Sequence, residues 1–215
     1  MNWVTYIIPR VVARYTSPYN RDIRVLEENG KYKILVNGSR QSGEYVRKLW
    51  QHAFCAFGII PSPDIQRILV LGVAGGTVLY LLRAMYPDAM IAGVEIDEKM
   101  LGIGKKYFGL DCVKGVTVTV DDAQTFLEKA VRHREHWDMI LVDTHVGSEV
   151  PSFVSNERFL VLLRRALAPH GLVIVNYLRE LKYQALSGHL RKKLKKIFGS
   201  VQETDIYFNR FFMVK

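Results

Sequence analysis

Apolar residues follow two different spacings in the central part of the chain. Between residue 67 and about residue 178, short apolar runs alternate with longer segments in which apolar residues recur at helical intervals. This alternation is typical of a parallel sheet flanked by helices. The apolar runs predict strands at 67–72, 90–95, 116–120, 138–143 and 172–177. The intervening segments predict helices at about 76–86, 98–107, 122–134 and 156–168.

The two ends of the chain depart from this alternation. Near the beginning, apolar runs at 22–27 and 32–36 flank Asn29-Gly30, a pair that suits a tight hairpin turn, and 43–57 has helical spacing. Near the end, a predicted helix at 180–198 precedes two strands. Only three residues, 208–210, join those strands, too few for a crossover helix, so the last strand is predicted to be antiparallel.

These elements predict an α/β fold of the Rossmann-like, doubly wound type. Its sheet would have seven strands, mostly parallel, with an antiparallel last strand. Pro61-Ser62-Pro63 divides the chain into an N-terminal β-hairpin and helix region, 1–60, and a nucleoside-binding domain, 61–215. A length of 215 residues is sufficient for one such domain with a small appendage.

A glycine-rich turn, Gly72–Gly76, follows the first parallel strand, and the next strand ends at Glu95. Small residues let the backbone approach a ligand closely, and a carboxylate there accepts hydrogen bonds from both ribose hydroxyls. The pair therefore indicates a nucleoside site, equally open at this point to NAD. Close packing of helix on strand is the purely structural alternative.

Charge adds a second candidate surface. The formal net charge is +9 at pH 7, and much of the excess lies in 189–196. Leu186, Leu190 and Leu194 recur at helical spacing, which predicts that the cations cover the solvent side of an amphipathic helix. Nucleic-acid binding through phosphate contacts is the alternative.

The cysteines and the first residues suggest a compartment. Cys55 and Cys112 lack the spacing of metal ligands or of a disulfide framework, so we expect no metal and a reducing, cytoplasmic environment. The apolar start, Met1–Ile8, is interrupted by Pro9, is too short to span a membrane and lacks the features of a signal peptide. We expect no membrane association.

A mostly parallel sheet that ends in a hairpin resembles the class I S-adenosylmethionine-dependent methyltransferases. Gly72–Gly76 is similar to their first motif, Glu95 to their ribose-binding acid, and Asp121-Asp122-Ala123 to their adenine-binding turn. The residues that the resemblance implies for cofactor binding are Gly72, Ala74, Gly76, Glu95, Ile96, Asp122 and Ala123. The structural alternative for Asp122 is a helix N-cap.

Within that superfamily the chain resembles the spermidine synthases from about Tyr15 to Leu178. Val36–Gln41 is similar to their "DG-x-x-Q" segment, which implies that Gln41 touches the nucleoside. Trp50-Gln51 lies where the family has substrate-pocket residues. The strand Trp137–Thr144 resembles the one that ends in the catalytic aspartate, which implies that role for Asp143.

Two departures from the family bear on the reaction. Gly75 stands where aminopropyltransferases have an aspartate that holds the amine of decarboxylated S-adenosylmethionine, and Val146 replaces the second acid of their "D-x-x-D" signature. Burying an ammonium without a counter-charge costs several kcal/mol. These replacements argue against ordinary putrescine aminopropylation.

Three functions remain open. The leading hypothesis is methyl transfer from S-adenosylmethionine to an unidentified small-molecule acceptor. The others are a divergent aminopropyltransferase that uses decarboxylated S-adenosylmethionine and a catalytically silent nucleoside-binding or scaffold protein. Asp143 would act as a base or orient the nucleophile, with loop capping as its structural alternative, and His145 is a substrate-pocket residue able to act as a base near neutral pH. The N-terminal hairpin and the apolar segment Trp3–Ile8 suggest a homodimer.

Overall fold

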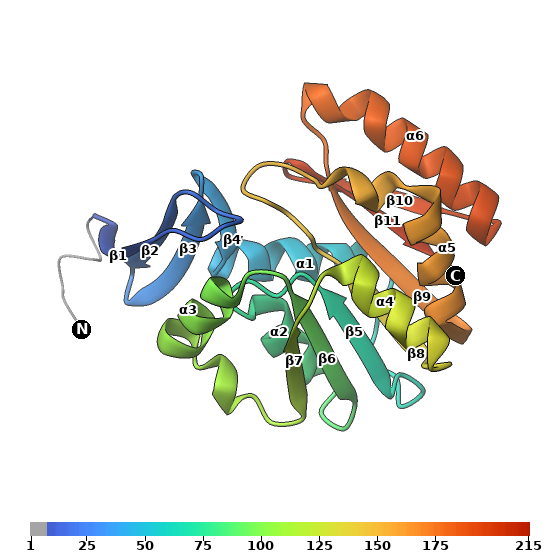
Figure 1. Cartoon of the computed structure of the whole chain (residues 1–215), viewed down its shortest axis with the longest axis horizontal. Helices are drawn as coiled ribbons and strands as arrows, with labels where there is room; N and C mark the ends of the chain where they lie inside the picture. The colour runs from blue at the N-terminus through green and yellow to red at the C-terminus, as the bar shows by residue number, and fades with distance from the viewer. Residues whose placement is uncertain (1–7) are drawn as a thin grey trace.

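The computed structural model describes residues 8–215, which form two sheets (Figure 1). The smaller sheet is antiparallel, has the order β1-β2-β3-β4, and lies at one end of the molecule. Its strands are β1 (Arg10–Tyr15), β2 (Ile23–Glu28), β3 (Lys31–Val36) and β4 (Ser39–Ser42). The hairpin between β2 and β3 turns at Asn29-Gly30, as the sequence predicts.

The larger sheet has seven strands in the order β10-β11-β9-β8-β5-β6-β7. Its strands are β5 (Arg67–Leu71), β6 (Met90–Glu95), β7 (Val116–Val120), β8 (Trp137–Val142), β9 (Leu167–Leu178), β10 (Gln202–Ile206) and β11 (Asn209–Val214). β11 pairs antiparallel with both β9 and β10, whereas the pairs among β5 to β9 are parallel. The predicted mostly parallel, seven-stranded sheet with an antiparallel last strand is confirmed.

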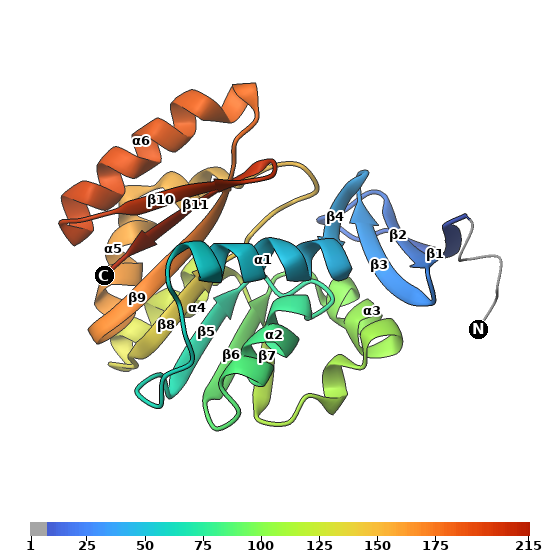
Figure 2. The same cartoon turned by 180° about the vertical axis from the view of Figure 1, so that it is seen from behind.

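Helices cover both faces of this sheet because its strands bury side chains on alternate sides. The helices are α1 (Glu44–Ala56), α2 (Thr77–Met85), α3 (Glu98–Phe108), α4 (Ala123–Arg132), α5 (Glu157–Ala166) and α6 (Leu181–Phe198). In β5, Leu69 and Leu71 pack in the core beneath α4, α5 and α6, the helices in front in Figure 1. Ile68 and Val70 pack in the opposite core with α1 and α2, the helices in front in Figure 2.

The smaller sheet is attached to α3. Its buried residues, including Ile23 and Ile34, pack against Met100 and Ile103 of that helix. Asp97 strengthens the attachment, because it caps the N-terminus of α3 and also accepts hydrogen bonds from the segment between β1 and β2, as detailed below. The two sheets thus meet at the ends of β5 and β6, where the sequence predicts the nucleoside site.

Helix α1 belongs by its packing to the larger sheet. Its buried residues, among them Leu49, Trp50 and Ala53, lie in the same apolar core as β5 and α2. The range 1–60 would place this helix with the hairpin region. We therefore propose that the division between the two units falls near Gly43, at the end of β4.

Two strands and one boundary differ from the sequence-based prediction. β1 and β4 are short or irregular edge strands with little fully buried surface, so neither produces a clear alternation of apolar and polar residues. β9 begins at Leu167, because α5 ends at Ala166 and Leu167 pairs with Trp137. Within residues 8–215, no helix combines the length and apolar character needed to cross a membrane. The apolar segment 3–7 lies outside the described residues.

Candidate active site

Two adjoining cavities open at the carboxyl ends of the parallel strands. This is where the strand order reverses between β5 and β8, the usual ligand site of an open α/β sheet. The first cavity, of about 280 Å³, lies over the glycine-rich turn and the ends of β6 and β7. The second, of about 350 Å³, lies between β3, β4, α1 and β9. Both are lined by Gln41, Val46, Asp143 and His145, which therefore form their common wall.

Glu95 holds the glycine-rich turn in position. Its Oε2 accepts hydrogen bonds from the backbone N–H of Val73 at 3.0 Å and of Ala74 at 2.8 Å, and its Oε1 accepts one from the N–H of Asp97 at 3.0 Å. Ala74 has a φ of 48°, a left-handed conformation that is uncommon for a residue with a side chain. The carboxylate thus supports a strained turn, a structural function that the sequence did not reveal.

Glu95 nevertheless lines the first cavity. Its Oε1 accepts a single hydrogen bond from residues 8–215, so it retains capacity for a ribose hydroxyl. Burial raises the pKa of this carboxyl, although its three backbone hydrogen bonds act in the opposite direction. A ligand hydroxyl that donates to the ionised form would offset part of the cost of burying the charge.

At Asp122 the structural alternative is observed, and the predicted adenine contact stays a prediction. Its Oδ1 accepts from the N–H of Thr125 at 2.9 Å, which makes it the N-cap of α4, and it also lines the first cavity beside Ala123. Asp121 is already engaged, because its carboxylate accepts from Lys129 Nζ at 2.7 Å and from the N–H of Asp122.

Gly75 is packed against the smaller sheet. A Cβ at this position would lie 2.8 Å from Ser42 Oγ and 2.9 Å from Ile34 Cδ1, both too close for a side chain. The N–H of Gly75 donates to Ser42 Oγ at 2.8 Å. The amine-binding aspartate of aminopropyltransferases is therefore absent, and an aspartate here would require the Ser42 and Ile34 side chains to move. Ser42 was not identified from the sequence.

The predicted cofactor residues separate into two groups. Those that line the first cavity are Gln41, Gly72, Ala74, Glu95, Ile96, Asp122 and Ala123. Gly76 does not line it: it caps α2 with a φ of 85° and lies against Leu110, so its function is to shape the turn. The cavity also has apolar walls, which include Val36, Val78, Met100 and Phe153. Carboxylates beside apolar walls fit the hydroxyls and the base of a nucleoside.

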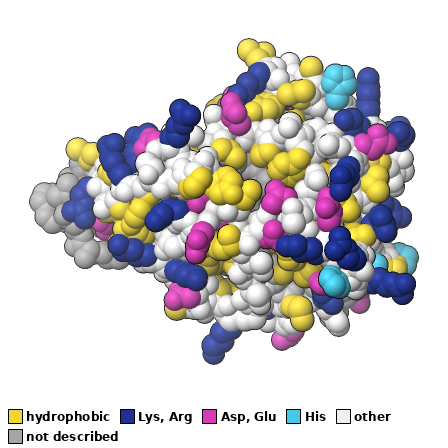
Figure 3. Space-filling view, in the orientation of Figure 1, with side chains coloured by type: hydrophobic (Ala, Val, Ile, Leu, Met, Phe, Trp, Pro, Cys, Tyr) yellow, Lys and Arg dark blue, Asp and Glu magenta, His cyan; other side chains and the backbone are white. Residues whose placement is uncertain are grey.

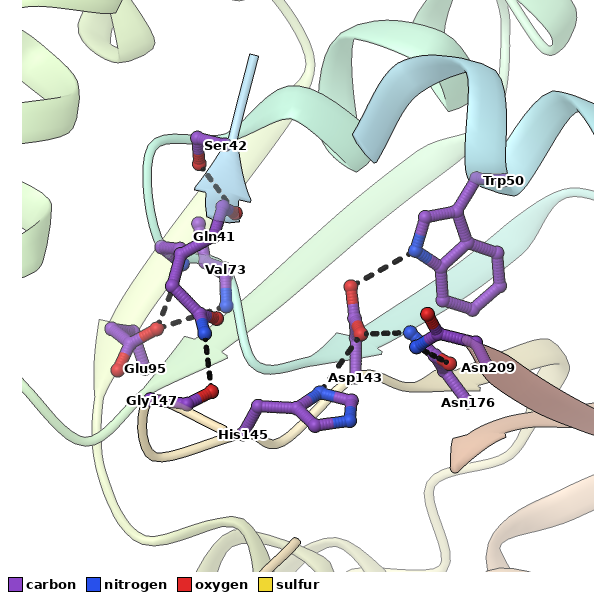
Figure 4. Close-up of polar contacts among 11 residues, drawn as sticks. Gln41, Ser42, Trp50, Val73, Glu95, Asp143, His145, Gly147, Asn176 and Asn209 are labelled. Carbon is purple, nitrogen blue, oxygen red and sulfur yellow. Dashed lines mark hydrogen bonds and ion pairs between the residues drawn. The ribbon is translucent and has the colours of Figure 1, made fainter. Parts of the chain in front are cut away.

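Asp143 is the centre of a network of side-chain hydrogen bonds (Figure 4). Its Oδ2 accepts from Trp50 Nε1 at 2.9 Å, and its Oδ1 accepts from Asn176 Nδ2 at 2.7 Å. Nδ1 of His145 lies 3.3 Å from the same Oδ1. Asn209 Nδ2 donates to Asn176 Oδ1 at 2.8 Å, which fixes the orientation of the Asn176 amide.

This network corrects the substrate-pocket prediction for α1. Trp50 lines neither cavity; it is fully buried and acts on the site through Asp143. Gln51 also lies outside both cavities: it is exposed, and its Oε1 accepts from Arg47. Adjacent residues on a helix point about 100° apart, and here Trp50 points into the core and Gln51 toward solvent. Asn209 was missed, because only the register of β11 on β9 brings it to Asn176.

Gln41 connects β4 to the loop after β8. Its Nε2 donates to the carbonyl oxygen of Gly147 at 2.7 Å, and its side chain lines both cavities. The predicted contact of this residue with a nucleoside thus agrees with its place in the common wall.

The second cavity contains few free charges. Lys33 is paired with Glu28 at 2.9 Å, and the Arg40 guanidinium lies over the ring of Tyr45, 5.0 Å from its centroid. Among residues 8–215, the acidic residues that line it are Asp143 and Glu180.

The basic face of α6 is largely engaged within the protein. Arg191 pairs with Glu203 at 3.0 Å, Lys196 with Glu157 at 2.9 Å, and Lys193 donates to a backbone carbonyl oxygen. Figure 3 shows Lys and Arg side chains spread across one whole face of the molecule and mixed with acidic ones. This arrangement favours a solvated helix face.

Comparison with known proteins identifies the family. The chain matches the Spermine/spermidine synthase domain over residues 47–208 and belongs to this family. It is 28% identical over 142 residues to a polyamine aminopropyltransferase of Vibrio vulnificus, covering 66% of this chain and 46% of that protein. It is 30% identical over 152 residues to an eEF1A lysine and N-terminal methyltransferase homolog of Drosophila pseudoobscura, covering 66% of this chain and 22% of that protein. The chain therefore spans less than half the length of these relatives.

Two solved structures share the fold. A probable spermidine synthase from Corynebacterium glutamicum superposes with a TM-score of 0.77 at 21% identity, covering 96% of this chain and 80% of that one. Human Methyltransferase-like protein 13, in complex with SAH, superposes with a TM-score of 0.69 at 21% identity, covering 78% of this chain and 82% of that one. The chain is thus a spermidine-synthase-like domain with both aminopropyltransferase and methyltransferase relatives.

Proposed function

We propose that this domain binds S-adenosylmethionine in the first cavity and transfers its methyl group to an acceptor in the second. The observation that carries the proposal is the packing of Gly75 on Ser42, which disfavours at this position the acid that would hold the amine of decarboxylated S-adenosylmethionine. Val146, at the second acidic position of the aminopropyltransferase signature, supports the same choice.

The residues of the first cavity divide the binding task between them. Glu95 would accept from the ribose hydroxyls, and Asp122 would accept from the adenine amine. When bound, S-adenosylmethionine supplies a methyl group on a positively charged sulfur. Asp143, in the common wall, would lie beside the path from this methyl group to the acceptor.

A thermal-shift comparison tests the proposal. S-adenosylmethionine, S-adenosylhomocysteine, decarboxylated S-adenosylmethionine and methylthioadenosine would each be added at increasing concentration, because a ligand of the native state stabilises by about 2.7 kcal/mol at 100 times its Kd. We expect the carboxylated nucleosides to stabilise most. Stronger binding of the decarboxylated form would favour aminopropyl transfer instead. Failure of all four to stabilise would contradict both transferase functions and leave a scaffold.

We also propose a cytoplasmic location, consistent with two free, exposed cysteines, and a small-molecule acceptor. Residues 8–215 contain no group of three or more His, Cys, Asp or Glu side chains arranged to hold a metal ion. Nucleic-acid binding by 189–196 and homodimer formation remain predictions. Sedimentation analysis and salt-dependent binding of an RNA duplex would test them.

A further inference from the structure

His145 is the one group of the common wall whose reactive nitrogen is buried and unused. Its side chain is 8% exposed, and its Nε2 has no hydrogen-bond partner among residues 8–215. Its other nitrogen, Nδ1, faces Asp143 Oδ1 at 3.3 Å. In Figure 4 the second ring nitrogen is turned away from Asp143. A buried polar atom without a partner calls for an explanation, and a catalytic function is one such explanation.

Asp143, by contrast, is occupied. Three side-chain nitrogens surround its two oxygens, those of Trp50, Asn176 and His145. Trp50 is fully buried, and the Asn176 amide is itself held by Asn209, so these donors have little freedom to leave. A carboxylate held in this way is well suited to orient a neighbour.

The 3.3 Å contact between Nδ1 and Asp143 Oδ1 favours one tautomer of the neutral imidazole. A hydrogen on Nδ1 that points at the carboxylate leaves Nε2 unprotonated, with its lone pair free. His145 lines both cavities, which places its side chain in the wall between the proposed methyl donor and the acceptor.

We propose that His145 Nε2 is the general base of the reaction and that Asp143 is a positioning residue that holds it in the reactive tautomer. This inference rests on the proposed methyl transfer. The lone pair of the acceptor nitrogen or oxygen forms the bond to the methyl carbon, and the sulfur–carbon bond breaks with its electron pair passing to sulfur. The proton of the acceptor passes to Nε2 and from there to solvent.

The proposal restricts the substrate class. The acceptor must carry a proton that is lost on methylation, as an amine N–H or a hydroxyl O–H does. A thioether or a tertiary amine has no such proton and would gain nothing from the base.

An electrophilic nucleoside tests the position of Nε2 without knowledge of the acceptor. The probe is adenosine whose 5′ carbon carries an aziridine ring, which places a reactive carbon where the transferred methyl group would lie. The Nε2 lone pair attacks a ring carbon, the ring carbon–nitrogen bond breaks, and the ring nitrogen takes a proton from solvent. Peptide mass spectrometry then locates the adduct.

We expect the adduct on His145, its loss in His145→Gln, and its retention in the control variant His136→Gln, whose histidine is exposed. Binding of the probe, measured by thermal shift, separates the possible failures. A probe that binds without modifying His145 would contradict the placement of Nε2 beside the transferred carbon. A probe that does not bind would contradict the proposed nucleoside site itself.

Long-range ¹H–¹⁵N spectra of the imidazole rings test the function of Asp143. With S-adenosylhomocysteine present, we expect His145 to carry its proton on Nδ1, and Asp143→Asn to lower the population of this tautomer and slow adduct formation at least tenfold. A merely structural contribution of Asp143 would leave the tautomer unchanged in folded protein. A proton on Nε2 in the wild-type protein would overturn the proposal, because that nitrogen could not then accept another.

Discussion

At the scale of single residues, Glu95 combines two functions with different electrostatic requirements. It supports the turn by accepting hydrogen bonds from backbone N–H groups, and it lines the first cavity, where it can accept a hydrogen bond from a ligand. Both functions favour the ionised carboxylate, whereas burial favours the neutral acid. The balance makes the stability of the ligand-free protein dependent on pH.

The sign of this dependence follows from the raised pKa. As pH rises above the ordinary value of 4.5, the unfolded chain loses the Glu95 proton while the folded protein still holds it. The free energy of unfolding therefore falls until the pH passes the folded-state pKa, by about 1.4 kcal/mol for each unit of difference.

Glu95→Gln removes this titration. In urea unfolding between pH 4.5 and 7.5, we expect the variant to gain stability relative to the wild type as pH rises. Parallel pH profiles for the two proteins would contradict the prediction. The variant is also expected to lose most of the thermal shift given by S-adenosylhomocysteine.

Gly75 gives a second prediction at this scale. Gly75→Asp forces a side chain against Ser42 and Ile34, and overpacking of this kind costs about 1–3 kcal/mol. We expect a lower Tm and no gain in affinity for decarboxylated S-adenosylmethionine. The matched control is Gly102→Asp, on α3, where an added Cβ meets nothing within 4 Å. A stable Gly75→Asp variant that prefers the decarboxylated nucleoside would contradict the assignment.

At the scale of elements, the site depends on how the smaller sheet is attached to α3. Asp97 Oδ2 accepts from Ser17 Oγ at 2.5 Å and from Asn20 Nδ2 at 2.7 Å, while its Oδ1 caps the helix through the N–H of Lys99. One carboxylate thus serves the helix and the contact between the two sheets.

We expect Asp97→Ala to lower the free energy of unfolding by roughly 2–4 kcal/mol, since it removes a cap and two hydrogen bonds to a charged group. Asn156→Ala is the control, because Asn156 caps α5 through the N–H of Arg158 without joining the sheets, and a lost cap costs about 1 kcal/mol. Denaturant unfolding of both variants measures the difference. Equal losses would show that the contact to Ser17 and Asn20 contributes nothing.

At the scale of the whole molecule, the first cavity is built from both sheets. Val36 and Gln41 of the smaller sheet line it together with the turn and strand ends of the larger one. A nucleoside bound there should therefore reduce local opening in both parts at once.

Hydrogen exchange measured with and without S-adenosylhomocysteine tests this coupling. We expect slower exchange in 39–42 of β4 and in 72–77 of the glycine-rich turn, with little change in the central part of α6, 186–196, which lines neither cavity. Protection confined to the larger sheet would mean that the smaller sheet is not part of the nucleoside site.

The extent of sequence-based prediction differs between these scales. Strands β5 to β8 and the helices were predicted to within a few residues, because their apolar spacing is strong and local. The edge strands β1 and β4 were not predicted from the sequence. Edge strands bury little side-chain surface, and their pairing depends on partners that are distant in the chain. At the site, Asp143 and Glu95 were found from their positions at strand ends, but their hydrogen-bond partners were not.

The sequence by itself determined the order of strands and helices along the chain and the antiparallel direction of the last strand. It also determined the glycine-rich turn and the acids that follow the strands. Each of these features depends on residues that are close together in the chain. Only the tertiary structure decided what those acids contact. Hydrogen bonds between Trp50, Asp143, Asn176 and Asn209 join residues up to 93 positions apart, and sequence spacing carries no information about them. The exclusion of an acid at Gly75 likewise follows from a strand, β4, that packs against the turn from another sheet.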